Sequence, residues 1–271
     1  MILSPIPRPQ LGHALDCFMT GLSDPVSRTV FRRIRVTSPD RAAAAEAERH
    51  RCVALSLARA FGMAIHPQGT QCLHNWDGMA LNGATEAYVI LHEVAHFALA
   101  PHERRGLIDF GLGPGPDTID HDAAESAKVL PLLAREEDEA AASLLGIVWE
   151  VELGQSALAS FLDQNWLEGL DRSAASHFTT VLGALRRRRL LTLRSPGRFD
   201  KAWAALGRQV DRARCAGCGC GPDLAIEYEN VRAAVRRARF ERRASTRARA
   251  RLVDSLFPQG DSPGLPSRSP S

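Results

Sequence analysis

The chain has 271 residues, of which 45% are hydrophobic and 24% charged, and its formal net charge at pH 7 is +3. This composition argues against a disordered chain, because it supplies enough apolar residues to bury a core. Six cysteines do not make a disulfide scaffold, no apolar run reaches the roughly 18 residues of a membrane span, and the proline-interrupted N-terminus lacks a signal-peptide core. We therefore expect a cytoplasmic protein in a reducing compartment, with no membrane association.

The first third of the chain predicts one helix and at most two short strands. Residues 1–40 mix prolines, arginines and short apolar pieces, and they are left unassigned. Residues 41–62 are rich in alanine and leucine, with an aspartate before them and a glycine at the end, so they predict a capped helix. Residues 63–84 are polar and contain glycine, and they could hold one or two short strands with a turn at Trp76–Gly78.

Two longer helices are predicted in the middle of the chain. Residues 85–100 form the central one, which Pro101 should end. A loop rich in glycine and proline follows at 103–122, and loops of this length often carry function. An acidic helix is predicted at 132–153, ending at Gly154.

The last 100 residues are predicted to be helical and increasingly basic. Shorter helices are expected at 156–169, 173–191 and 198–213, and a last helix at 223–257. Between Arg232 and Arg251 there are nine arginines and one acid. Such a helix could bind RNA or an acidic partner, and the alternative is a charged helix that only confers solubility.

The central helix carries the pattern HExxH at residues 92–96. His92 and His96 are one helical turn apart, so both imidazoles can bind the same divalent ion. Glu93 lies beside them and can act as the general acid/base that exchanges a proton with water activated by the ion. Because the rest of the helix is apolar, these polar groups would be costly to bury without a partner. The pattern predicts one metal site, with a polar stripe on a surface helix as the alternative.

A zinc site of this type needs a third protein ligand. We choose Glu137, because it falls on the apolar stripe of the acidic helix, where alanines allow close helix contact. That stripe comprises Leu133, Ala141, Leu144 and Val148. Glu136 is the second choice, while Glu139, offset from the stripe by about 100°, remains open. His102 has the spacing of the HExxHxxGxxH class but lacks its glycine and its later methionine, which favours a solvent-exposed histidine.

The segment HEVAHFALAPHERRGLIDFG resembles a segment of elongation factor P hydroxylase-like proteins that runs HExxHW, a short connection, RR and DFG. The shared positions are His92, Glu93, His96, Arg104, Arg105, Asp109, Phe110 and Gly111, with Phe97 in place of the tryptophan. This resemblance implies an HExxH protein that acts on or near the translation machinery, with iron as an alternative to zinc. The acidic helix is also similar to the helix that supplies the third ligand in short gluzincin peptidases, except that Ala141 stands one turn after Glu137, where those peptidases carry Asp or Asn.

Three charged residues after the central helix are further candidates for the site. Arg104 and Arg105 could bind a substrate carboxylate or phosphate, and the alternatives are a solvated pair or salt bridges to the acidic helix. Asp109 could orient a ligand histidine through its second ring nitrogen, or it could simply begin the following turn.

A cysteine cluster offers a second place for a metal. Cys215, Cys218 and Cys220 supply three thiolates, but a closed zinc site needs four ligands. Free thiols in a glycine-rich turn are the alternative.

Together these patterns predict a helix-rich α+β protein with a zincin-like, gluzincin-type metal-binding domain at residues 41–170. Residues 1–40 precede it, a basic helical region follows at 171–257, and a disordered tail covers 258–271. The predicted function is hydrolysis of a peptide or protein substrate, with Zn²⁺ as the metal. An iron-dependent (Fe²⁺) hydroxylase is the first alternative, and a non-enzymatic metal-containing protein that binds nucleic acid or a regulatory partner is the second.

Overall fold

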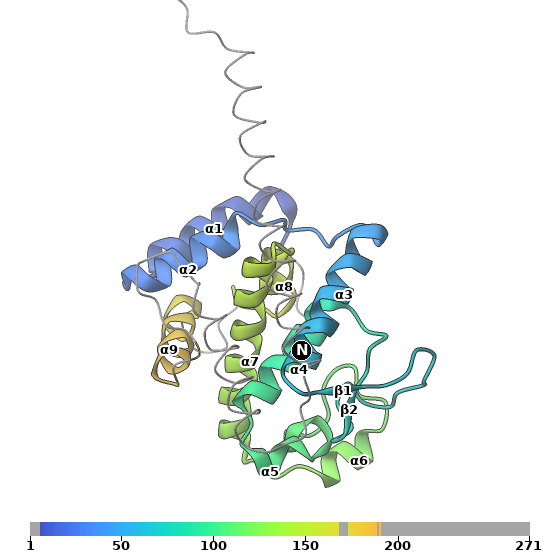
Figure 1. Ribbon diagram of the computed structural model, residues 1–271. Coiled ribbons are helices and arrows are strands. Elements are labelled where there is room, and N and C mark those ends of the chain that lie inside the picture. The colour runs from blue at the N-terminus through green and yellow to red at the C-terminus, as the bar shows by residue number, and fades with distance from the viewer. Residues whose placement is uncertain (1–5, 168–172, 189, 191–271) are drawn as a thin grey trace, which may run out of the picture.

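The computed structural model describes residues 6–167, 173–188 and 190, and Figure 1 shows their arrangement. The helices predicted at 198–213 and 223–257, the cysteine cluster, the arginine-rich segment and the tail lie outside the described residues. So does the domain boundary predicted at residue 170, and the division into domains stays a prediction.

Two helices at the centre of the molecule supply about a third of the buried apolar residues of the described chain. The central helix α4 (Ala87–Leu99) packs against the longest helix, α7 (Leu132–Leu153), and on its other side against α3 (Ala44–Ala60) (Figure 1). Small residues allow α4 and α7 to approach closely: a β-carbon on Gly146 would lie 3.4 Å from the backbone nitrogen of His92. The bounds of α7 are those predicted, and those of α3 and α4 differ by no more than three residues at either end.

The segment left unassigned in the sequence forms two helices, α1 (Arg8–Gly21) and α2 (Pro25–Arg35). They pack with α7, α8 (Ala157–Asp163) and α9 (Ala174–Arg187). The contact is aromatic: the rings of Phe18, Phe31, Phe161 and Phe178 lie 4.6 to 6.4 Å from one another, measured between centroids. These residues belong to the same buried cluster as the apolar residues of α4 and α7.

The remaining elements are short, and β1 packs against α3 while α5 and α6 pack against η1. Strands β1 (Ala64–Ile65) and β2 (Ala80–Leu81) agree with the one or two short strands that residues 63–84 could hold, and they pair in parallel. The stretch predicted as a loop holds α5 (His102–Arg105), the 3-10 turn η1 (Ile108–Gly111) and the start of α6 (His121–Ser126). The described chain is therefore helix-rich, as predicted. None of its helices combines the length and the apolar character needed to cross a membrane.

Candidate metal centre

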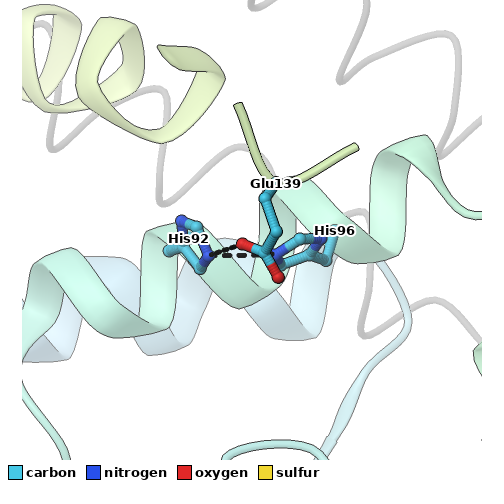
Figure 2. A group of neighbouring side chains, drawn as sticks. All are labelled: His92, His96 and Glu139. Atoms are coloured by element: carbon cyan, nitrogen blue, oxygen red, sulfur yellow. Dashed lines mark hydrogen bonds and ion pairs between the residues drawn. The ribbon is translucent and has the colours of Figure 1, made fainter. Parts of the chain in front are cut away.

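Three side chains converge between α4 and α7. His92 and His96 project from consecutive turns of α4, and Glu139 reaches them from the neighbouring helix, as Figure 2 shows. Glu139 Oε2 lies 3.4 Å from His92 Nε2 and 3.3 Å from His96 Nε2. The two Nε2 atoms are 2.9 Å apart. Among the described residues, this is the group of His, Cys, Asp and Glu side chains whose ligand atoms lie close enough to hold a metal ion.

The spacing of these atoms fits coordination of an ion better than direct hydrogen bonding. Bonds of about 2.0–2.1 Å to a tetrahedral zinc ion place its ligand atoms about 3.3–3.4 Å from one another. Both contacts of Glu139 with the imidazoles have this length, which exceeds the usual 2.7–3.2 Å of a hydrogen bond. Only the distance between the two imidazole nitrogens is shorter. The three donors also suit zinc chemically, since they are two imidazoles and one carboxylate.

Glu93 lies beside this group and differs from Glu139 in its ionisation. Burial raises the pKa of Glu93 to about 8, against the opposing effect of His92, while the charges of Asp109 and Glu139 raise it further. Burial also opposes ionisation of Glu139, but its contacts with His96 and His92 outweigh this effect and lower the pKa of Glu139. The ionised carboxylate of Glu139 is therefore suited to bind a cation, whereas the carboxyl of Glu93 is suited to hold a proton.

The structure does not bring Glu137, the residue chosen as third ligand, to the two histidines. Glu139, which the sequence left open, lies there instead. Glu137, Glu136 and His102 are all exposed and lie outside the cluster, whereas Glu139 belongs to it. The difference comes from the stripe used to orient the helix, because Leu133 is 67% exposed and does not face the core. A better signal was available: Glu139, Ser143 and Gly146 are spaced four and three residues apart, and such small residues let a partner helix come close.

An aromatic column holds the ring of His96 in place. Phe110 lies in a stacked arrangement with His96 on one side, with centroids 5.5 Å apart, and with Trp76 on the other, also at 5.5 Å. The indole Nε1–H of Trp76 donates to the backbone oxygen of Arg105 at 2.8 Å. Phe97, which replaces a tryptophan of the hydroxylase-like pattern, meets the Trp76 ring edge to face. The column therefore fixes the plane of the His96 imidazole.

The two arginines make internal contacts, and neither lines the cavity described below. Arg104 Nη2 donates to Asp138 Oδ2 at 2.6 Å, and both side chains are almost fully buried. Arg105 donates through Nε to the backbone oxygen of Ala100, and its guanidinium lies over the ring of Phe97. The alternative of a salt bridge to the acidic helix is thus correct for Arg104. Arg104 lies in the segment after α4, and Asp138 directly precedes Glu139 on α7. The salt bridge therefore restricts rotation of α7 about its axis and helps to orient Glu139.

Asp109 does not hydrogen-bond to either metal-site histidine. Nδ1 of His96 is buried and has no hydrogen-bond partner among the described residues. Asp109 instead accepts a hydrogen bond from Thr118 and lies 4.0 Å from Nδ1 of His74. Burial raises the pKa of Asp109, although the hydrogen bond from Thr118 opposes this effect. Of the two possibilities that the sequence left open, the position of Asp109 in the turn after α5 agrees with the second.

A cavity of about 660 Å³ opens onto the metal-site residues. Its walls come from α4, α7, η1 and the loop after it, the end of α8 and the residues that follow it, and two residues of α9. The acidic side chains in the lining are Glu93, Asp109, Asp117, Glu139 and Asp163, and no lysine or arginine of the described residues lines it. Its size is typical of sites for small molecules or short peptides, and its charge disfavours anionic substrates.

Comparison with known proteins adds no family. No family model matches this sequence. No curated protein and no solved structure is significantly similar to it. The residues and their geometry therefore carry the functional interpretation.

Proposed function

We propose that this protein is a metal-dependent hydrolase with a zincin-like, gluzincin-type metal-binding domain, and that it cleaves peptide bonds with zinc as its metal. The observation that carries the proposal is the convergence of His92, His96 and Glu139 beside the buried Glu93, at the wall of a large cavity. The distances from Glu139 to both imidazoles match those between the ligands of a tetrahedral ion.

Glu93 is the acid/base group in this proposal. A bound divalent ion supplies Lewis acidity, which polarises a carbonyl group and lowers the pKa of water. Glu93 lines the cavity, accepts a proton from the attacking water and passes it to the amine nitrogen that leaves. Its burial in the wall of the site favours this role, because a carboxyl with a raised pKa both takes and returns a proton near neutral pH.

The metal site is tested by comparing two glutamates of the same helix in the full-length protein. Glu139→Gln removes the proposed ligand, whereas Glu137→Gln makes the same chemical change at an exposed position two residues away. We expect the wild type and E137Q to retain one zinc per chain by elemental analysis. Mutating a residue that only hydrogen-bonds to a metal ligand typically lowers metal affinity by roughly 10- to 100-fold. We expect the zinc affinity of E139Q to fall by more than this, because Glu139 is itself a proposed ligand. Equal zinc content in both variants would contradict the proposed ligand set.

Hydrolysis is tested separately with Glu93→Gln. This variant keeps the size of the side chain and leaves the three ligands intact, so we expect it to retain zinc. Its cleavage of fluorescein-labelled casein, or of a random peptide library read by mass spectrometry, should fall by about 10²- to 10⁴-fold. If the zinc-loaded wild type cleaves neither substrate, peptide hydrolysis is refuted while the metal site stands.

The same ligand set favours one second candidate. Two histidines and one carboxylate that occupy one face of the metal ion also suit non-haem Fe²⁺ in oxygen-dependent enzymes. The resemblance of residues 92–111 to elongation factor P hydroxylase-like proteins implies the same chemistry. Iron in the purified protein, together with consumption of oxygen and no peptide cleavage, would favour this hydroxylase over the hydrolase.

A further inference from the structure

A cluster of exposed apolar side chains lies where α7 begins. Val129, Leu132 and Leu133 are 56%, 61% and 67% exposed, and they are three of the seven large apolar side chains exposed in the described part of the chain. No two of the other four are neighbours in the sequence. Leu130, within the cluster, packs against the core and fixes the backbone that carries it. Apolar residues gathered at one place on a surface indicate that another segment or molecule covers them.

The described part of the chain ends close to this apolar cluster. Helix α9 packs against α7, as Figure 1 shows, and Arg188 Nη1 at the end of α9 lies 3.5 Å from Asp138 Oδ1. Leu190, the last described residue, packs against the core. Asp138 follows Leu132 by six residues, which is about 9 Å along the helix axis. Residues 191–271 therefore start near the apolar cluster.

The segment 198–213, which lies outside the described residues and is predicted from the sequence to be a helix, has one apolar face. The residues of this face are spaced four, three and four apart, and they are Phe199, Trp203, Leu206 and Val210. In a helix they would fall within about 60° of one another. Three basic residues would fall on the opposite side: Lys201, Arg208 and Arg212. Such a helix is stabilised mainly by burial of its apolar face against another surface.

The connection is long enough to bring this segment to the apolar cluster. Residues 191–198 separate Leu190 from Phe199, and they span at most about 27 Å when extended. The contact between Arg188 and Asp138, together with the distance along α7, falls within this span. A segment tethered by a short connection has a high effective concentration at its binding site, so it competes well against a second copy of the chain.

We propose that residues 198–213 bind to the apolar cluster through their apolar face, with Trp203 against Leu132 and Leu133. The C-terminal region is thereby held to the start of the helix that supplies Glu139. This inference does not require a metal ion, so its success or failure is separate from that of the proposed function.

The fluorescence of Trp203 tests this contact in the full-length protein. The chain has four tryptophans, and the other three, Trp76, Trp149 and Trp166, are 3%, 5% and 5% exposed. Subtracting the emission of a Trp203→Phe variant isolates the signal of Trp203, and phenylalanine keeps the apolar face. In the wild type we expect Trp203 to emit at the short wavelength of a buried indole and to be shielded from quenching by acrylamide.

Two variants should release Trp203 from the opposite sides of the contact. The double variant L132S/L133S changes residues that are exposed in the described structure, so the core stays intact. We expect it to shift the emission of Trp203 to longer wavelength and to expose Trp203 to acrylamide. Phe199→Ser, which changes the segment itself, should have the same effect. Each variant is measured with and without Trp203→Phe.

The matched control is the double variant L73S/I119S. Leu73 and Ile119 are exposed apolar residues joined by a backbone hydrogen bond of 2.8 Å, and they lie outside the apolar cluster. The chemical change is the same kind of apolar-to-serine replacement, so we expect Trp203 to stay shielded in this variant.

Four results would overturn the proposed contact. Three come from fluorescence: Trp203 exposed in the wild type, Trp203 still shielded in L132S/L133S, or Trp203 exposed equally by the control variant. The fourth comes from sedimentation velocity, in which we expect monomers of 29.5 kDa for the wild type and for L132S/L133S. A wild-type dimer that dissociates in L132S/L133S would assign the apolar cluster to a second copy of the chain.

Discussion

Glu150 is buried in the core with a titratable carboxyl, and its replacement by glutamine should make the protein more stable at alkaline pH. The side chain is 2% exposed, and Ser160 Oγ lies 2.6 and 2.8 Å from its two carboxyl oxygens. Burial raises the pKa of Glu150 to about 8, although Ser160 and the charge of Arg41 oppose this effect. Glu150→Gln preserves the size of the side chain and an acceptor for the serine, and it removes only the ionisation.

The size and sign of the effect follow from the two pKa values. The ordinary value of 4.5 applies to the unfolded chain and about 8 to the folded one, a difference of about 3.5 pH units. At about 1.4 kcal/mol for each unit, the ceiling on the effect is about 5 kcal/mol. Because the folded state keeps a proton that the unfolded state releases, the free energy of unfolding should decrease as pH rises from 4.5 to 8.

Urea unfolding of the wild type and E150Q at pH 5 and pH 9, followed by circular dichroism, measures this contribution. At pH 5 the carboxyl is neutral in the folded protein, so the two unfolding free energies should be similar. At pH 9 the variant should be more stable by a few kcal/mol. Because other groups titrate equally in both proteins, only the difference between them is diagnostic. A difference that is the same at both pH values, or a less stable variant at pH 9, would refute the reasoning.

Three further substitutions test features of the fold around the site. Arg104→Gln removes the closer of the two arginines paired with the buried Asp138 and leaves Arg188, at 3.5 Å. It should lower the free energy of unfolding, by less than the about 3–5 kcal/mol expected for a fully unpaired buried charge, and part of the loss should be recovered in the double variant with Asp138→Asn. Gly78→Ala should cost about 2 kcal/mol or more in thermal unfolding, because φ is +91° and the new β-carbon would lie 2.6 Å from a backbone oxygen. Phe110→Ala should lower the free energy of unfolding by about 3–5 kcal/mol. It should also weaken zinc binding in a chelator competition, because the His96 ring loses its stacking partner. Unchanged zinc affinity would show that the aromatic column does not position His96.

Local patterns were sufficient to predict the helices that carry the metal site. Apolar periodicity and a clear stop signal gave α4 to within two residues, and Gly154, in a left-handed conformation with φ of 79°, ends α7 as expected of a helix-terminating glycine. The HExxH spacing brings both imidazoles to one point because it is a property of a single helix. These predictions needed no knowledge of tertiary structure.

The third ligand could not be predicted in the same way, because it depends on how two helices rotate against each other. Leu133, at the start of α7, was counted on the apolar stripe although its side chain is 67% exposed, and it led the predicted face away from the true one. Asp138 is buried through its salt bridge with Arg104, which composition alone does not reveal. The N-terminal helices were missed for a similar reason. Their apolar residues are buried by packing against α8 and α9, which the local sequence does not show.

The close contact at Gly146 also means that a tilt of α7 about this point would move Glu139 relative to the two histidines. Glu139 lies seven residues from Gly146, which is about 10 Å along the helix axis. A tilt of about 5° around that contact would displace the carboxylate by about 1 Å, several times the roughly 0.2 Å over which metal–ligand distances vary. In the proposed metal site, the bulk of a side chain two turns away from Glu139 would therefore change how strongly an ion is bound, although that side chain does not contact the ion.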